Sequence, residues 1–559
     1  MPTPREKLAQ SLEALHRLQS RGVVAIRSTA LSRTDRQRLQ AGGFLKEVMK
    51  GWYIPSRPDE PAGDSTAWYA SFWHFCADYL ADRFGAEWCL SPEQSLSLHG
   101  GNRSVPAQLF VRAPKAGNKP TPLPHGTSMF DMRASLPAPN ETAMLDGLRL
   151  FSVPAALIAV SEPFFRRAAT DARAAMAAVR DASEVLPLLL EGGHSTIAGR
   201  MAGAFRHAGQ ERIADEIVKT MEKAGYAVRE TNPFANAPRA VLPARERSPY
   251  VNRIRLMWQA MRGPVLGWLP ASPGPPRSPR AYLKAVDEIY VDDAYHSLSI
   301  EGYRVSTDLI ERVRRGAWNP DENPEDRENR NALAARGYYD AFVSVKASVE
   351  KVLAGANAGE VSRADHRDWY RQLFGPSVTA GIVPAAELAG YRSGPVYIRR
   401  SMHVPPPREA VRDCMPVLFE LLANETDPAV RVVLGHFVFV YIHPYMDGNG
   451  RMGRFLMNVM LASGGYPWTI IPLERRNDYM TALEAASVGQ DIRPFARFIG
   501  GLLEAGRRRR LAAEKNGLRR HGSRAGVRDA SRGSGRPPEP QRDISSKNEP
   551  ERTRANRSA

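Results

Sequence analysis

Cysteine is scarce in this 559-residue sequence, which has only three, Cys76, Cys89 and Cys414. Three widely separated thiols exclude a disulfide framework and a cysteine-rich zinc site, and they fit a reducing compartment. No apolar run reaches the roughly 18 residues that a membrane-spanning helix needs, and the N-terminus lacks the apolar core of a signal peptide. The sequence therefore predicts a soluble, cytoplasmic protein without a membrane partner.

Acidic residues are too few to balance the basic ones, and the formal net charge is +17. Most of this excess lies at one end, because Lys and Arg outnumber Asp and Glu by 16 to 6 after residue 506. That segment has no hydrophobic periodicity, which predicts a disordered basic tail over 506–559. Such a tail would hold nucleic acid or an acidic partner in a salt-dependent way, or it would only aid solubility. The charge therefore does not make the whole chain a nucleic-acid-binding protein.

The length predicts several domains, and 43% hydrophobic residues are enough to bury their cores. Helical and extended patterns alternate in the first half, prolines cluster between 264 and 279, and helical patterns dominate the second half. The expected fold is therefore multidomain. Its parts are a winged helix-turn-helix over 1–60, a mixed α/β region over 61–240, a Pro-rich linker over 241–280, an all-α domain over 281–505, and the tail over 506–559.

The most informative stretch is H-P-Y-M-D-G-N-G-R-M-G-R, residues 443–454. His443 is of the residue type that accepts a proton near neutral pH and so activates a hydroxyl. Asp447 suits one or two positions on an octahedral Mg²⁺ whose other ligands are phosphate oxygens and water. The residues that remain suit an anion: backbone N–H groups of a tight turn at Gly448, Asn449 and Gly450, and bidentate donors at Arg451 and Arg454.

This stretch resembles the central motif of the Fic family, H-P-F-x-[D/E]-G-N-G-R-x-x-R, whose members mostly transfer AMP from ATP to a protein hydroxyl. Tyr445 replaces the usual Phe, and its hydroxyl needs a partner if the ring is buried. The resemblance implies ATP and Mg²⁺, with His443 as the base and Asp447 as the metal ligand. Tyr479 is then the candidate neighbour of the adenine, with core packing as the alternative.

The stretch S-L-S-I-E-G, residues 297–302, ends a predicted helix over 282–302. Taken alone it is a helix end with a glycine cap. Beside the central motif it resembles the inhibitory element of Fic proteins, [S/T]-x-x-x-E-[G/N], which starts here at Ser297. The resemblance implies that Glu301 pairs with Arg454 and blocks the productive position of the γ-phosphate.

The stretch A-G-Y-R-S-G-P-V-Y-I, residues 389–398, resembles the lead into the Fic flap, a hairpin that holds the target chain by strand addition. Residues 399–403 would form its tip. A largely apolar helix over 430–442 would then deliver His443 from the core. The implied target-binding residues are Val396, Tyr397, Ile398 and Arg399.

The first 60 residues resemble the N-terminal domain of AbiEi-type antitoxins, and the α/β region over 61–240 resembles the second part of the same proteins, which suggests a toxin–antitoxin setting. Three short helical pieces and a hairpin over 44–54 predict a winged helix, a fold that binds duplex DNA or docks on proteins. The candidate DNA-binding residues are Arg33, Arg36, Arg38 and Lys50.

The residues and the resemblance together predict an autoinhibited protein adenylyltransferase acting on a Ser, Thr or Tyr hydroxyl. Its partners would be a target protein, DNA through the winged helix, and a second copy of the chain in a homodimer. Three alternatives stay open: a DNA-binding regulator with a silent or sensory Fic domain, a Fic enzyme that removes AMP, and the use of another nucleotide.

Overall fold

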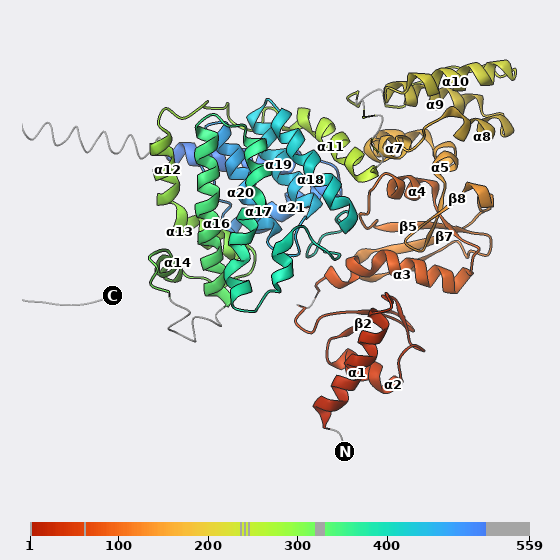
Figure 1. Cartoon of the computed structure of the whole chain (residues 1–559). Helices are drawn as coiled ribbons and strands as arrows, with labels where there is room; N and C mark the ends of the chain where they lie inside the picture. Colours follow the sequence, from red (N-terminus) through yellow and green to blue (C-terminus); the bar gives the residue numbers. More distant parts are fainter. Residues whose placement is uncertain are drawn as a thin grey trace, which may run out of the picture. The chain divides into compact units, whose positions relative to one another are not determined.

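The computed structural model of the chain describes residues 3–60, 63–234, 237–239, 242–243, 246, 248–318 and 330–509. Residues 1–504 form one compact unit and residues 505–559 form a second. Figure 1 follows the elements in chain order. Within the described ranges, no helix is long and apolar enough to cross a membrane.

The N-terminal residues build a small helix–sheet layer. Helix α1 begins at a capping box in which Thr3 and Glu6 satisfy each other's backbone N–H groups, and α2 begins at Ser32, whose hydroxyl accepts from Asp35 N. The predicted hairpin is present, but residues 3–60 contain two helices where three helical pieces were expected. The elements are α1 (Pro4–Gln19), β1 (Ile26–Arg27), α2 (Arg33–Ala41), β2 (Leu45–Met49) and β3 (Trp52–Pro55), with the antiparallel sheet order β1-β3-β2.

The next region is a mixed α/β structure, as predicted. Helix α3 (Thr66–Phe84) buries Trp68, Phe72 and Cys76 on its inner face. The sheet has the order β4-β5-β7-β6, in which only the β5–β7 pair is parallel. Its strands and the β8–β9 hairpin are β4 (Cys89–Leu90), β5 (Gln108–Ala113), β6 (Lys119–Pro122), β7 (Ser128–Arg133), β8 (Thr142–Leu145) and β9 (Leu148–Phe151). Its other helices are α4 (Pro92–His99), α5 (Val153–Ala159), α6 (Glu162–Arg167), α7 (Ala169–Met176), α8 (Leu186–Glu191), α9 (Ser195–His207) and α10 (Glu211–Lys223).

The predicted linker over 241–280 contains a buried helix, which corrects that prediction. Helix α11 (Pro249–Val265) begins at the N-cap Ser248 and packs into the core of the helical region. Its apolar residues recur at helical spacing before the prolines become dense, so the proline count obscured a 3.6-residue period. A linker without helix or strand, as expected, is found only over 266–278, and it begins with a turn at 266–268.

The helical region over 281–505 is built around two pairs of helices. One pair consists of two long antiparallel helices, and the other lies at the centre. Helices α16 and α17 pack along each other, and α19 packs against α20, which brings the motif into the middle of the region (Figure 1). The helix predicted over 282–302 is divided near Ile289. The helices are α12 (Pro279–Glu288), α13 (Tyr290–Ile300), α14 (Thr307–Arg314), α16 (Arg330–Leu353), α17 (Ala358–Thr379), α18 (Arg408–Asn424), α19 (Pro428–Ile442), α20 (Asn449–Ser463) and α21 (Arg476–Ser487).

The flap segment over 390–407 contains no strand, so the predicted β-hairpin is not formed. Prolines at 395 and 405–407 lack the N–H group that a strand ladder needs. The N–H groups of Arg400, Met402 and His403 instead bond to side chains outside any ladder.

The tail was predicted to be disordered from residue 506, but residues 506–509 are helical. The rest of that prediction, over 510–559, lies outside the described residues.

Candidate active site

The catalytic candidate His443 lies at a forced helix end. Helix α19 is largely apolar and mostly buried, and its last residue is followed by His443 in the left-handed conformation, with φ 53° and ψ 62°. Pro444 disfavours right-handed helix at the residue before it, so the chain leaves the helix at this point. Arg392 fixes the turn, because its Nε donates to His443 O over 2.8 Å and its backbone N donates to Pro444 O over 2.9 Å.

The imidazole of His443 is held in one tautomer. Nδ1 lies 3.1 Å from Val440 O, and since a carbonyl only accepts, Nδ1 carries the proton and Nε2 keeps a lone pair. Burial is the main cause that lowers the pKa of His443 to about 4, and the positive charge of Arg392 adds to it, against the Val440 hydrogen bond and the nearby carboxylates. The ring is therefore a neutral proton acceptor at pH 7.

The loop after His443 is shaped by the side chain of Asn449. Its Oδ1 accepts from Tyr445 N over 2.9 Å, and its Nδ2 donates to Tyr445 O over 2.8 Å. The carboxamide is thus used inside the loop, which leaves the backbone for an anion. Gly448 has φ +80°, and a Cβ there would lie 2.7 Å from the ring of Phe374, so no larger residue fits.

Helix α20 starts directly at this loop and presents its N-terminus. Among the described residues, no hydrogen bond is made by the backbone N–H groups of Asn449, Gly450 and Arg451, which are the first-turn donors of a 15-residue helix. Such donors and the helix dipole favour a phosphate. A Cβ at Gly450 would lie 2.2 Å from Glu301 Oε1, so a carboxylate already occupies the space above this helix end.

Arg451 lies between two aromatic rings. Its guanidinium carbon is 5.1 Å from the Tyr303 ring centre and 5.0 Å from that of Phe374, and its side chain is only 1% exposed. Nη2 lies 3.5 Å from Asp447 Oδ2. Nε has no partner among the described residues, so one donor of a buried cation is left over for a ligand.

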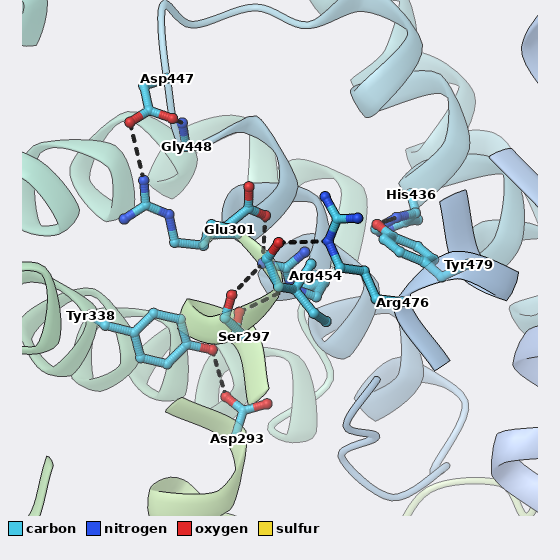
Figure 2. A network of polar contacts seen from close by, with 12 residues as sticks. Asp293, Ser297, Glu301, Tyr338, His436, Asp447, Gly448, Arg454, Arg476 and Tyr479 are labelled. Carbon is cyan, nitrogen blue, oxygen red and sulfur yellow. Dashed lines mark hydrogen bonds and ion pairs between the residues drawn. The ribbon is translucent and has the colours of Figure 1, made fainter. Parts of the chain in front are cut away.

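Arg454 joins the central motif to the stretch 297–302, about 150 residues earlier in the chain (Figure 2). Its Nε donates to Ser297 Oγ over 2.9 Å, and its Nη2 donates to Ser297 O over 3.0 Å and to Glu301 Oε1 over 2.8 Å. The predicted positions Ser297, Glu301 and Arg454 therefore meet. Nη1 is buried and has no partner within the described ranges.

The carboxylate of Glu301 is ionised in this setting. Burial alone would raise the pKa of Glu301, but the charges of Arg454 and Arg451 and the hydrogen bond from Arg454 outweigh it, and the pKa lies below its ordinary value. Helix α13 ends at Ile300, and Gly302 follows with φ +91°, the glycine cap expected from the sequence.

Asp293 and four further residues that sequence reasoning missed support this arrangement. Tyr338 Oη donates to Asp293 Oδ2 over 2.7 Å (Figure 2). Trp468 Nε1 donates to Asp293 Oδ1 over 3.0 Å, and the two bonds together fix α13. Arg476 Nε donates to Ile300 O over 2.9 Å and so satisfies the end of that helix. The fourth is Arg392, for which the quoted stretch Y-R-S-G was a signal, whereas nothing local marks the other three.

Tyr479 does not lie open to a ligand. It is buried, and its hydroxyl lies 2.7 Å from His436 Nε2 (Figure 2). Its ring packs beside those of Phe495 and Phe498. The alternative of core packing describes this residue better than contact with an adenine.

Asp447 is the one motif carboxylate that suits a metal. Its side chain is 56% exposed, and Oδ1 accepts from Gly448 N over 2.6 Å. No group of three or more His, Cys, Asp or Glu side chains gathers for a metal within the described part of the chain. A single exposed carboxylate fits Mg²⁺, because this ion keeps several waters and phosphate oxygens as ligands.

The flap candidates lie in an irregular segment after Arg392. Val396 is buried, Tyr397 and Ile398 are half-buried, and Arg399 is exposed. Among the described residues, no hydrogen bond is made by the backbone N–H or C=O groups of Val396 and Tyr397. This short stretch therefore has an edge to which another chain can bond.

The four candidate DNA-binding residues in the N-terminal part differ in how exposed and how engaged their side chains are. Arg33 and Lys50 are exposed. Arg36 instead donates to Ser28 O over 2.5 Å and lies over the ring of Tyr53, so it stabilises its own layer. Arg38 lies 3.9 Å from Asp35. The structure therefore leaves the first two as the accessible members of the predicted set.

The sequence of this site matches known proteins. Residues 360–461 match the Fic/DOC family. The protein adenylyltransferase Fic of Drosophila grimshawi is 32% identical over 228 residues, which cover 40% of this chain and 43% of that protein. The protein adenylyltransferase fic-1 of Caenorhabditis elegans is 29% identical over 238 residues, which cover 42% of this chain and 44% of that protein. The chain thus spans less than half the length of the curated relatives it matches.

Solved structures of similar proteins include Fic-1 from C. elegans, which is 20% identical. That match covers 60% of this chain and 93% of that one, with a TM-score of 0.36. The family match covers α17 to α20 almost completely, with the whole stretch 443–454, and it ends before the tail. The chain therefore carries a Fic/DOC domain.

Proposed function

We propose that residues 281–505 transfer AMP from ATP to a Ser, Thr or Tyr hydroxyl of another protein, and that Glu301 restrains this transfer. The observation that carries the proposal is the cluster of donors around the Glu301 carboxylate, which are Arg454, Arg451 and the N-terminus of α20, with the neutral ring of His443 nearby. These groups suit a polyphosphate beside a base. The curated relatives named protein adenylyltransferase support the same reaction.

Each residue of the site would have its own role in the transfer of AMP. The acceptor hydroxyl gives its proton to Nε2 of His443 as its oxygen bonds to the α-phosphorus, and the bond from that phosphorus to the pyrophosphate oxygen breaks. The Nδ1–H of the ring stays bonded to Val440 O, which stabilises the imidazolium that forms. The first-turn N–H groups of α20 would hold the α-phosphate. Mg²⁺ held by Asp447 would neutralise charge on the departing pyrophosphate.

The two arginines would bind the outer phosphates. Arg451 Nε and Arg454 Nη1 are buried donors without partners in the described ranges, and an unsatisfied donor of this kind costs about 1–3 kcal/mol. A phosphate oxygen would satisfy each of them. The Nη2 group of Arg454 is shared with Glu301, so the γ-phosphate and this carboxylate compete for the same cation.

A labelled-nucleotide experiment tests the reaction. Wild type, Glu301→Gly and the double variant Glu301→Gly/His443→Ala are incubated with ATP labelled on either the α- or the γ-phosphate. AMP transfer predicts protein-bound label from the α-position only, strongest in Glu301→Gly and lost in the double variant. Label from the γ-position would show phosphoryl transfer instead, and competition by other nucleotides reports the base preference.

The alternatives give different results in the same assay. If Glu301 activates water to remove AMP, Glu301→Gly would keep label on a protein that the wild type clears. Absence of label in every folded variant would favour a silent or sensory Fic domain.

A second function, binding of duplex DNA by residues 1–60, is favoured by one observation. The order α1-β1-α2-β2-β3 with its β1-β3-β2 sheet supports the winged-helix prediction, although it has two helices rather than three, and the turn of the β2–β3 hairpin carries the exposed Lys50. The exposed Arg33 begins α2. Both would contact phosphates rather than bases.

A further inference from the structure

The tip of the flap segment is tied to the α/β region by an ion pair. Arg399 Nε donates to Asp64 Oδ2 over 2.8 Å. The Asp64 side chain is 2% exposed, whereas that of Arg399 is 58% exposed. The other oxygen of Asp64 accepts from Thr66 N and Thr66 Oγ1, over 2.9 and 2.5 Å. A buried carboxylate is stable only when it is paired, so Asp64 needs these partners.

Two backbone contacts extend this connection. Arg400 N donates to Thr66 Oγ1 over 3.3 Å, and Val105 N donates to Met402 O over 2.8 Å. The side chains of Met402 and Val404 pack against the hydrophobic cluster that contains Val105 and the inner face of α3. The tip therefore contributes to the core of the α/β region.

Helix α21 holds the tip from the side of the Fic domain. Glu484 Oε1 accepts from Met402 N over 2.8 Å, and Oε2 accepts from Ser401 Oγ. His403 then returns the chain to the active site, because its Nε2 donates to Tyr441 O over 2.9 Å and its ring stacks on that of Tyr441 at 4.1 Å. Tyr441 lies two residues before His443. The anchored tip is therefore coupled to the end of the catalytic helix.

The anchored and open parts of the flap are adjacent. Residues 400–403 have their N–H groups bonded, whereas Val396 and Tyr397 have unbonded backbone groups among the described residues. An edge can receive an extended chain only if its own position is fixed, because the binding energy must otherwise order the edge first.

We propose that the α/β region fixes the acceptor-binding edge of the flap, and that Asp64 is a positioning residue acting through Arg399. This inference rests on the proposed function, because it assigns the acceptor side of the same transfer. The region at 63–234 then affects how well the protein target binds. Nucleotide binding depends instead on α20 and its arginines. The target would add its main chain along 396–398, between the Asp64–Arg399 contact and the turn at His443.

Hydrogen exchange of the full-length protein tests the anchor without any activity. Asp64→Asn and Arg399→Ala should each speed amide exchange in 400–404 by about tenfold or more, as expected when local opening becomes easier. The double variant should add little to either single change, because both remove one contact. Asp59→Asn is the matched control, since Asp59 is an exposed acid five residues earlier, and it should leave the flap unchanged.

Transfer in the Glu301→Gly background gives the functional readout. Adding Arg399→Ala should lower self-labelling or target labelling from α-labelled ATP several-fold through the acceptor KM, with ATP affinity unchanged. Unchanged exchange in 400–404 in both single variants would overturn the anchor. Equal acceleration throughout α3 and β5 would also overturn it, because Asp64 would then serve only its own region. If no variant is labelled, the proposed transfer fails while the exchange data still decide the anchor.

Discussion

Arg454 and Glu301 are bonded through Nη2 and Oε1 over 2.8 Å, although 153 residues separate them in the sequence. The same arginine also holds Ser297 through two further hydrogen bonds, so one guanidinium fixes the end of α13 beside the N-terminus of α20. The carboxylate lies where a phosphate would find the helix dipole and the arginine together. A nucleotide phosphate and the Glu301 carboxylate would therefore compete for the hydrogen bonds and the charge of Arg454.

Glu301→Gly should raise AMP transfer by about 10- to 100-fold, because a hydrogen bond to a charged group contributes about 1.5–3 kcal/mol. The rate of label transfer from α-labelled ATP at saturating nucleotide measures this. Glu288→Gly is a matched control at the end of α12, with an exposed carboxylate that only faces Lys284. Equal rates for wild type and Glu301→Gly would contradict the brake, as would a gain that survives the further change Arg454→Ala.

The local structure of the motif was predictable because its signals are local. Apolar residues mark α19, Pro444 ends it, and glycines allow the loop before α20. The pairing of Glu301 with Arg454 could be named only through the resemblance, since spacing alone does not bring two distant segments together.

The features that could not be predicted from the sequence depend on contacts with other parts of the fold. Asp293 is one acid among many until Tyr338 and Trp468 meet it in the core. Helix α11 was hidden because neighbouring prolines dominated the composition. The hairpin expected in the flap segment is not formed, because side chains of other elements, among them Glu484, accept hydrogen bonds from its backbone.

The pH dependence of transfer should reflect the buried imidazole. Because the pKa of His443 is lowered to about 4, the neutral base persists well below pH 6.5. We expect kcat in the Glu301→Gly variant to stay level from about pH 8 to pH 5 and to fall only as the pH approaches 4. His443→Ala should lower kcat by about 10²–10⁴ from about pH 8 to pH 5, with ATP affinity nearly unchanged. A kcat limb near pH 6.5 that His443→Ala removes would contradict the low pKa.

Tyr445→Phe should stabilise the protein. The ring stacks on Tyr370 at 3.7 Å, but the Tyr445 hydroxyl is buried and has no partner among the described residues, contrary to the sequence expectation. Removing an unsatisfied hydroxyl should raise the free energy of unfolding by about 1 kcal/mol. Denaturant unfolding measures this, with Tyr466→Phe as the control, since the Tyr466 hydroxyl donates to Pro270 O over 2.7 Å and its loss should destabilise.

Binding of duplex DNA should depend on Arg33 and Lys50 rather than on Arg36. The first two are exposed, whereas Arg36 is engaged by Ser28 and Tyr53. In a protein ending at residue 509, Arg33→Glu/Lys50→Glu should weaken retention of duplex at low salt and reduce its salt dependence by about two ions. Retention equal to that of the unsubstituted protein would favour a docking role for residues 1–60.

Acid should release the flap anchor before it unfolds the active site. Burial would raise the pKa of Asp64, but the hydrogen bonds from Thr66 and Arg399 outweigh it and lower the pKa to about 2. A carboxyl whose folded pKa is depressed contributes stability that is complete above its unfolded pKa of about 4, and that contribution is lost as the pH falls toward 2. The lowering of almost two units corresponds to about 2 kcal/mol.

The pH profile of flap exchange checks this sign. At pH 6, Asp64→Asn should show faster amide exchange in 400–404 than the wild type, after correction for the intrinsic pH dependence of exchange. The difference should shrink between pH 4 and pH 2, because protonation removes the same charge from the wild type that the substitution removes. Since α20 and His443 do not contact Asp64, exchange in 449–463 should not follow this profile. A difference that stays constant down to pH 2 would mean that the Asp64 charge does not hold the flap.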